Sequence, residues 1–320
     1  MADWTPTTGY GYTGNGTNIT PERWYDAYMD ALATHDMWAQ FVTYAAGAGD
    51  FVSKGEGDYI RVNFFSKMDV PSASLVEGTL IARGTQTTSQ VALTVVGEGN
   101  RLDVSGLQGW AIGDKLIQKA AESCVNNAVE TNDARIGATY VGASSYFSCY
   151  GTDAYYENQH TGTRGTEYFY PEHARLMVQR LRRLGVSPMA DGYYHAVGAP
   201  GAWNNMLKQS QVIDNAARLG DSSPYAKGMV GAFAGLAFHD EIGGNASTNY
   251  STTVGTSVIF GADAVIGGND INRSDLIWYY PDPYHDAGRL QRVTWHFKQA
   301  YSRTLEGTTN ARLFKLYHKH

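Results

Sequence analysis

The spacing of apolar side chains predicts an extended ribbon early in the chain. From residue 59 to about 103 apolar and polar positions alternate with a period of two, which is typical of β-strands. YIRVNFF forms one predicted strand and SQVALTVV another, and SLVEGTLIARG between them carries few large side chains on either face. A ribbon of two strands is at best marginally stable alone. We therefore expect it to pack against another surface, on this chain or on another molecule.

Helical periodicity appears in three places. Thr20 as N-cap, with Pro21 and Glu22 after it, predicts a short helix behind an extended segment of about 20 residues. A second helix begins at Asp114, and its apolar stripe runs through Leu116/Ile117, Ala120/Ala121, Cys124/Val125 and Ala128/Val129. A third begins at Pro171 and stops at Gly185, with three arginines in its last turns.

The remaining segments predict a mixed α/β region and two closing strands. YYHAV is a predicted strand, and a helix follows from Ala202. Glycine-punctuated strands follow in GMVGAFAGLAF, TSVIFGADAVIGG and LIWYYPD, and LQRVTWHFKQAYSRTL with RLFKLYHK predicts a long terminal hairpin. Residues 142–170, rich in Tyr, Gly and Thr, show no periodicity and suggest a surface loop or an insertion.

Composition narrows the class of protein. The 320 residues are 43% hydrophobic and 18% charged, so the chain is globular, and its net charge of −6 without a dense basic run argues against a nucleic-acid coat. The first residues lack a basic and then apolar leader, and no stretch approaches about 18 apolar residues, so we expect neither secretion nor membrane insertion. The chain contains 36 Gly and 22 Tyr, and such a high content of glycine and tyrosine is common among extracellular β proteins and viral structural proteins.

Candidate chemistry is sparse. His239, Asp240 and Glu241 are adjacent, but neighbours on a strand point to opposite faces, so a polar strand end is the better interpretation than a metal site. Cys124 lies on an apolar helix stripe and Cys149 in a predicted polar loop, and we expect both thiols to stay unpaired. No phosphate-binding, zinc-protease or serine-hydrolase motif occurs, while the arginines of the third helix and the scattered aromatics leave phosphate or sugar contact open.

Four short motifs occur in a set order along the chain. SLVEGTLIARG contains L-x-E-G at Leu75, Glu77 and Gly78, and GMVGAFAGLAF matches G-x-I-G-x-F-x-G-x-x-F in its glycines and phenylalanines. VIFGADAV contains F-G-x-D-A, and the stretch 281–313 places a Trp-bearing strand after Asp-Pro and then an Arg-bearing strand. With the order of arm, ribbon, long helix and mixed region, the chain resembles the major capsid proteins of tailed bacteriophages, most closely the N-four-like coat proteins.

The resemblance implies an α+β fold of the Hong Kong 97 type. It implies an N-terminal arm with a short helix at 1–50, a ribbon called the E-loop at 51–106, and a peripheral (P) domain with a spine helix at 107–165. Residues 166–279 would form the axial (A) domain, and 280–320 would return to the P domain as the terminal hairpin. The ribbon would lie across a neighbouring subunit and the arm would wrap another, with contacts from Trp4, Tyr10, Tyr12, Leu75, Glu77, Gly78 and Arg83.

The resemblance also implies a function and partners. The chain would self-assemble into hexamers and pentamers of an icosahedral shell around double-stranded DNA, which it would touch only weakly and non-specifically. A decoration protein, a portal and a scaffold are further possible partners, and assembly in the bacterial cytoplasm would lead to a place in the virion. No catalytic residue, cofactor or metal is expected. Two alternatives stay open: another phage structural subunit such as a tail or decoration protein, or a polysaccharide-active enzyme.

Overall fold

The computed structural model describes residues 37–46, 59–65, 88–105, 114–151, 154–157, 167–199, 201–209, 229–241, 255–270, 278–281, 290–304 and 311–319. The chain divides into two compact units. The first comprises Met1–Asp36, Gly97–Thr131 and Ile271–Lys298, and the second comprises Met37–Val96, Asn132–Asp270 and Gln299–His320. The helix predicted at 20–36 lies outside the described residues.

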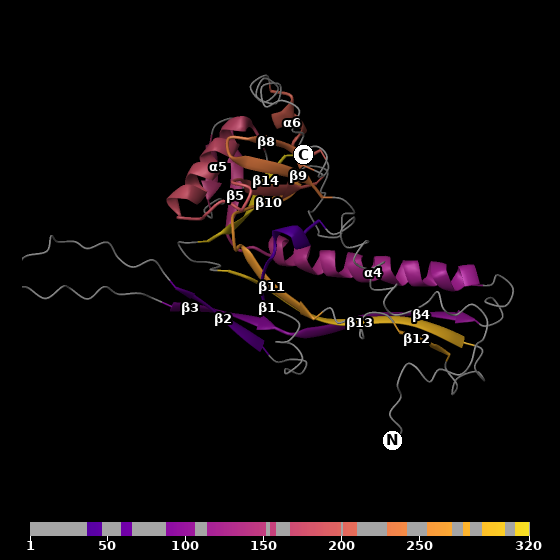
Figure 1. Cartoon of the computed structure of the whole chain (residues 1–320). Helices are drawn as coiled ribbons and strands as arrows, with labels where there is room; N and C mark the ends of the chain where they lie inside the picture. The colour runs from indigo at the N-terminus through magenta and orange to yellow at the C-terminus, as the bar shows by residue number, and fades with distance from the viewer. Residues whose placement is uncertain are drawn as a thin grey trace, which may run out of the picture. The chain divides into compact units, whose positions relative to one another are not determined.

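A seven-stranded mixed sheet forms the centre of the second unit (Figure 1). Its order is β6-β5-β14-β10-β7-β9-β8, from β5 (Tyr146–Tyr150), β6 (Ala154–Glu157), β7 (Tyr194–Gly198), β8 (Met229–Phe233), β9 (Leu236–Asp240), β10 (Gly255–Phe260) and β14 (Leu313–His318). The central strands β7 and β10 are buried on both faces, and each buries a polar side chain among its apolar ones, His195 in β7 and Ser257 in β10. β14 pairs antiparallel with β10 and parallel with β5, so both of its edges are occupied.

Helix α5 (Pro171–Arg183) covers part of this sheet and confirms the third predicted helix. Its buried face includes Ala174, Met177 and Leu181, which share a core with Phe147 and Phe238 from the sheet. The Tyr170 backbone N–H donates to His173 Nδ1 at 3.0 Å across the first turn. Gly185 at φ +72° ends the helix, as predicted, because an L-residue rarely adopts that conformation.

A second cluster of the same unit joins the start of the described chain to helix α4 (Asp114–Val141). Trp38 and Phe41, around the 3₁₀ turn Ala39–Phe41, pack with Ile136 and Tyr140 from the last turns of α4 and with Phe260 from β10. Tyr140 Oη donates to the Phe41 carbonyl at 2.7 Å. These residues are buried core, so the arm predicted at 1–50 includes a segment that belongs to the folded body.

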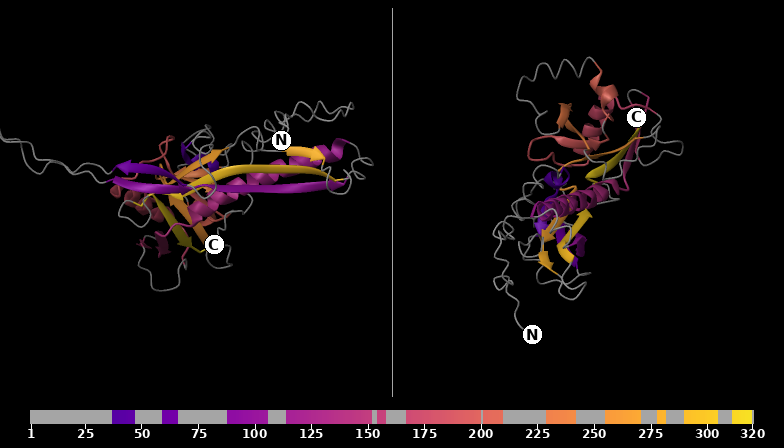
Figure 2. Two further views of the ribbon diagram at one scale, coloured as in Figure 1. Left: turned by 90° about the horizontal axis from the view of Figure 1, so that it is seen from below. Right: turned by 90° about the vertical axis from the view of Figure 1, so that its right-hand side faces the viewer.

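The first unit holds the other part of α4 against long strands. β4 (Val96–Ser105) and β13 (Leu290–Arg303) pair and run side by side in Figure 2, and β12 (Trp278–Pro281) pairs with β13 on its other edge. Asn127 Oδ1 accepts from Trp295 Nε1 at 3.2 Å and from Asn100 Nδ2 at 3.0 Å, which ties the helix to both long strands. Ala120, Cys124, Val125, Ala128 and Val129 are buried, which confirms the stripe within the part of the helix whose side chains are described.

Several predictions need correction. The terminal hairpin is wrong, because β13 belongs to a five-stranded sheet with β1 (Thr43–Ala46) and β11 (Val265–Asp270), whereas β14 is central in the other sheet. The stretch from 142 is not a loop throughout, since β5 and β6 lie in it. The helix predicted from Ala202 is a single turn, α6 (Asn204–Leu207).

Glycines punctuate the strands as the sequence indicates. GMVGAFAGLAF is a hairpin of β8 and β9, and its two-residue turn has Ala234 at φ +55° and Gly235 at φ +89°. Positive φ at both central residues is the geometry of a type I′ turn, which matches the twist of a hairpin. The register shifts between Met229 and Gly231, a bulge within β8.

None of the helices in the described ranges is both long enough and apolar enough to span a bilayer.

Candidate functional site

The period-two pattern predicted a two-stranded ribbon, and the structure describes the base of this ribbon as two paired strands. β2 (Tyr59–Phe65) and β3 (Thr88–Thr94) pair antiparallel from Tyr59↔Thr94 to Phe65↔Thr88. The return strand, predicted as SQVALTVV, ends at Thr94, and the period-two region continues from Val96 as β4, which pairs with β13. The predicted contact residues Trp4, Tyr10, Tyr12, Leu75, Glu77, Gly78 and Arg83 all lie outside the described residues.

One face of the ribbon base packs on its own chain. Ile60, Val62 and Phe64 from β2 join a buried cluster with Leu93, Val95, Ile266 and Ala300. Leu93 is fully buried, Val91 is half-buried and Ser89 is exposed, so burial decreases along β3 away from Thr94. The apolar floor that the isolated ribbon needs is therefore supplied at its base by β11 and β13.

The other face of the ribbon base is exposed and polar. Tyr59, Arg61 and Asn63 from β2 lie on it with Gln90, Ala92 and Thr94 from β3. Arg61 Nη2 donates to Tyr59 Oη at 2.7 Å, and its guanidinium lies 4.9 Å from the centre of the Tyr59 ring. Alternation of an anchored apolar face with an exposed polar face gives the ribbon one register on the body, since a shift by one residue would exchange the two faces.

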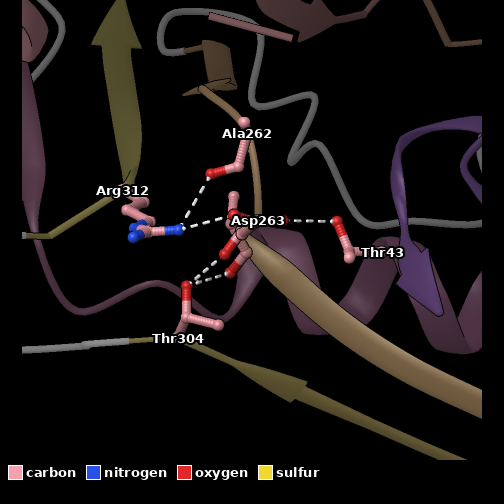
Figure 3. Close-up of polar contacts among 6 residues, drawn as sticks. Thr43, Ala262, Asp263, Thr304 and Arg312 are labelled. Carbon is pink, nitrogen blue, oxygen red and sulfur yellow. Dashed lines mark hydrogen bonds and ion pairs between the residues drawn. The ribbon is translucent and has the colours of Figure 1, made fainter. Parts of the chain in front are cut away.

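A polar corner lies at residues 261–264, between β10 and β11 (Figure 3). Asp263 Oδ2 pairs with Arg312 Nη1 at 3.0 Å, and Asp263 Oδ1 accepts from Thr43 Oγ1 at 3.0 Å. Thr304 Oγ1 donates to the carbonyls of Asp263 and Ala264. Arg312 also places its guanidinium 6.0 Å from the centre of the Phe64 ring in the ribbon.

The buried histidines His195 and His239 form a side-chain pair beneath Phe41. Their Nδ1 and Nε2 atoms lie 2.9 Å apart, and both rings pack on Phe41. His195 Nε2 lies 3.1 Å from Asp191 Oδ2, so this carboxylate would stabilise the protonated form of the imidazole. Burial lowers the pKa of both imidazoles, and that of His239 falls to about 4, although Asp191 opposes the shift. At neutral pH the pair is uncharged.

Ser257 and His318 form a hydroxyl–imidazole contact like that of a catalytic nucleophile and its base, but both residues are buried in the core. Ser257 Oγ and His318 Nε2 are 2.8 Å apart, and His318 Nδ1 is 2.9 Å from the Lys319 carbonyl oxygen. Both side chains are fully buried, and Trp203 stacks on the imidazole at 5.9 Å between ring centres. A substrate cannot reach Oγ in this arrangement, so the contact serves to satisfy two buried polar groups.

The His239-Asp240-Glu241 run does not converge on one point. His239 pairs with His195, Asp240 is half-buried at the end of β9, and the Glu241 backbone N–H donates to the Gly198 carbonyl at 2.7 Å. Burial raises the pKa of the Asp240 carboxyl. Within the described ranges no three His, Cys, Asp or Glu side chains gather as metal ligands would.

Both cysteines are buried free thiols. Cys124 lies on the apolar face of α4, as expected, and burial raises its pKa. Cys149 lies on β5 and not in a polar loop, and burial raises the pKa of its thiol far above the usual range. YFSCY has no apolar–polar alternation, and its first four residues are buried, so the polar residues around it were a poor guide to exposure.

The sequence singled out Asp263 within F-G-x-D-A but assigned it no contact. A Gly-Ala-Asp-Ala run between two β-rich segments is a turn signal. Asp263 adopts φ +54°, a conformation that Asp tolerates better than most residues. Nothing in the spacing indicates that Thr43, 220 residues earlier, and Arg312, 49 residues later, converge on it.

Comparison with solved structures places the fold among capsids of viruses that infect bacteria. No protein-family model and no curated sequence matches this chain significantly. The chain is similar to a structure described as the cyanophage Pam1 capsid asymmetric unit, with a TM-score of 0.61 and 13% identity over 100% of this chain and 99% of that one.

Two further structures agree with this. The head of Helicobacter pylori bacteriophage KHP40 gives a TM-score of 0.59 at 11% identity, covering 82% of this chain and 85% of that one. The capsid of Ralstonia phage GP4 gives 0.57 at 12%, covering 83% and 84%. The chain therefore has the α+β fold of these phage capsid structures, the Hong Kong 97-type fold, which confirms the fold prediction.

Proposed function

We propose that this chain is the major capsid protein of a tailed bacteriophage and self-assembles into an icosahedral shell around double-stranded DNA. The observation that carries the proposal is the likeness to the Pam1 capsid structure over the whole length of both chains. A likeness that covers nearly all of both chains is expected when the two proteins use the fold for the same task, although fold alone does not determine function.

The geometry of the ribbon base supports this proposal. Its inner face is anchored on β11 and β13 as far as Phe64, and Ser89, which is paired with Phe64 on β3, is already exposed. A two-stranded ribbon is at best marginally stable without a surface to pack on. A second copy of the chain supplies that surface in a shell built from one subunit, and the contact residues are Leu75, Glu77, Gly78 and Arg83.

The finer assignments belong to the same proposal. The chain is an N-four-like coat protein with its arm at 1–50, E-loop at 51–106, P domain at 107–165 and 280–320, and A domain at 166–279. Trp4, Tyr10 and Tyr12 of the arm contact a neighbour. Hexamers and pentamers form the shell in the host cytoplasm and remain in the virion, and a decoration protein, a portal and a scaffold are its partners. The subunit is non-catalytic, needs no metal and contacts DNA weakly.

The register of β2 and β3 allows a sharp test of assembly. Phe65 is opposite Thr88, so residues 66–87 can be replaced by Asn-Gly, a two-residue turn that closes an antiparallel hairpin. The full chain should form closed shells by size-exclusion chromatography and negative-stain microscopy. The shortened variant should keep the circular dichroism and melting temperature of the subunit but form no shells.

Other outcomes contradict the proposal. Fibres or small rings from the full chain would indicate a tail or decoration subunit, and a stable monomer would remove the shell-forming role. Normal shells from the shortened variant would show that the ribbon is not an interface. Charge reversal at Glu77 or Arg83 provides an independent measurement. If each residue pairs with an opposite charge on a neighbouring subunit, its reversal should lower the melting temperature of the particle more than that of the free subunit.

A further inference from the structure

The corner at 261–264 joins two sheets and contacts both ends of the connection between β13 and β14. β10 belongs to the seven-stranded sheet and β11 to the five-stranded sheet, so the chain changes sheets at this corner. The Thr304 backbone N–H, at the end of β13, donates to the Ala264 carbonyl at 3.0 Å. The Gly261 N–H donates to the carbonyl of Arg312, just before β14, at 3.2 Å.

Asp263 is the residue that unites these contacts (Figure 3). One carboxylate oxygen accepts from Thr43 and the other pairs with Arg312, while the backbone carbonyl accepts from Thr304. The side chain of Asp263 is 45% exposed and that of Arg312 is 27% exposed, so their attraction is screened by water and adds little to the stability of the whole fold. Its effect is local and geometric.

Two routes lead from Asp263 to the ribbon. Arg312, aligned by the carboxylate, faces the Phe64 ring in β2. Thr43, which donates to the same carboxylate, is opposite Ile266 in the β1–β11 pairing, and Ile266 is part of the apolar floor beneath Ile60, Val62 and Phe64. The Asp263 carboxylate therefore contacts one residue that faces the Phe64 ring and one that pairs with the apolar floor.

We propose that Asp263 is a positioning residue for the ribbon: through Arg312 on Phe64 and Thr43 beside Ile266 it holds the ribbon base in one orientation on the body. The inference deepens the proposed function, because a ribbon that must reach a neighbouring subunit is useful only if its direction is set before contact. It also explains why an Asp, which tolerates φ +54° and offers two acceptor oxygens, occupies the motif position F-G-x-D-A.

The test measures amide hydrogen exchange in the full-length chain before assembly. Asp263→Gly keeps the positive-φ backbone and removes both oxygens, whereas Asp263→Asn keeps an acceptor for Thr43 and loses the charge that faces Arg312. Arg312→Gln removes the guanidinium without changing the turn. Glu157→Gln is the matched control, since it breaks the pair with Arg180 Nε at 2.7 Å, which has a similar exposure but lies between β6 and α5.

Asp263→Gly and Arg312→Gln should raise exchange in β2 and β3 about tenfold and leave β7 and β9 unchanged, because local opening of one element need not involve the rest. Asp263→Asn should lie between these variants and the wild type, and Glu157→Gln should leave the ribbon unaltered. Equal acceleration in all four strands, or no acceleration in β2 and β3, would overturn the inference. Since the readout needs no shell, a failure to assemble would reject the proposed function and leave this result intact.

Discussion

His195 Nδ1 and His239 Nε2 lie 2.9 Å apart inside the second unit, with Phe41 packed on both rings. At this distance one nitrogen holds a hydrogen and the other accepts it, so the contact favours two neutral imidazoles. If both rings were protonated, two N–H groups would face each other. Phe260 is the aromatic neighbour from β10, and Asp191 is the charged group that acts on both histidines.

The histidine pair predicts acid sensitivity of the unassembled subunit. Both folded-state pKa values lie below the value of about 6.5 expected for an unfolded chain, and that of His239 lies at about 4. Between these limits the unfolded chain binds more protons, so the free energy of unfolding decreases as pH falls from about 6.5 toward 4. Above pH 6.5 the pair carries no such penalty. Thermal unfolding at pH 7.5 and 5.0 measures the difference.

His239→Gln provides the comparison for this pH dependence. It keeps a polar side chain but removes a titrating group, so the difference between pH 7.5 and 5.0 should shrink. His296→Gln, at an exposed position on β13, should leave that difference as in the wild type. If His239→Gln shows the full difference, the acid sensitivity arises elsewhere.

Gly261 predicts a large penalty from a small substitution. A Cβ at this position would meet the Ser187 carbonyl oxygen at 2.7 Å and Val186 Cγ1 at 2.5 Å. Since the backbone oxygen cannot rotate away, Gly261→Ala should destabilise the subunit by about 1–3 kcal/mol in chemical denaturation.

Gly142→Ala is the matched control for Gly261→Ala. There the atom closest to the added Cβ is Arg303 Nη1, the end of a flexible side chain that can move. The cost should be clearly smaller than at Gly261. Equal losses for the two alanines would mean that the close approach at Ser187 does not constrain the corner.

The two thiols should be inert in the folded chain. Only a thiolate reacts readily with a disulfide reagent, and burial raises the pKa of both Cys124 and Cys149 while excluding the reagent. A colorimetric thiol assay should detect almost no reaction natively and two thiols in denaturant. Rapid native labelling of either cysteine would contradict the burial, and peptide mapping would identify which one.

Local patterns predicted most elements of this fold, and long-range pairing explains the rest. YIRVNFF, the helix from Asp114 and the helix between Pro171 and Gly185 carry their own periodicity and end signals, so their types were predictable. That β14 inserts between β5 and β10 was not, because adjacency in sequence favours a hairpin with β13 and no local signal opposes it. The corner at Asp263 shares this property, since its partners converge from three distant segments.

Residues 37–42 are held on α4 by contacts of Trp38. The Trp38 backbone N–H donates to Asp133 Oδ1 at 2.8 Å, and the Trp38 ring, which is fully buried, stacks on Tyr140 with 5.0 Å between ring centres. Trp38→Ala removes the ring and leaves a cavity beside Tyr140, so unfolding should become easier by about 3–5 kcal/mol. Denaturant titration of the subunit measures this loss.

Substitutions at Tyr140 and Asp133 separate the ring from the backbone contacts. Tyr140→Phe keeps the stack on Trp38 but removes the hydroxyl that donates to the Phe41 carbonyl, which should cost about 1 kcal/mol. Asp133→Asn keeps an acceptor oxygen for the Trp38 N–H and should be milder than Asp133→Ala, which leaves that N–H without its acceptor. If Trp38→Ala costs no more than Tyr140→Phe, the segment is held by its backbone contacts and the buried ring is not the anchor that joins it to α4.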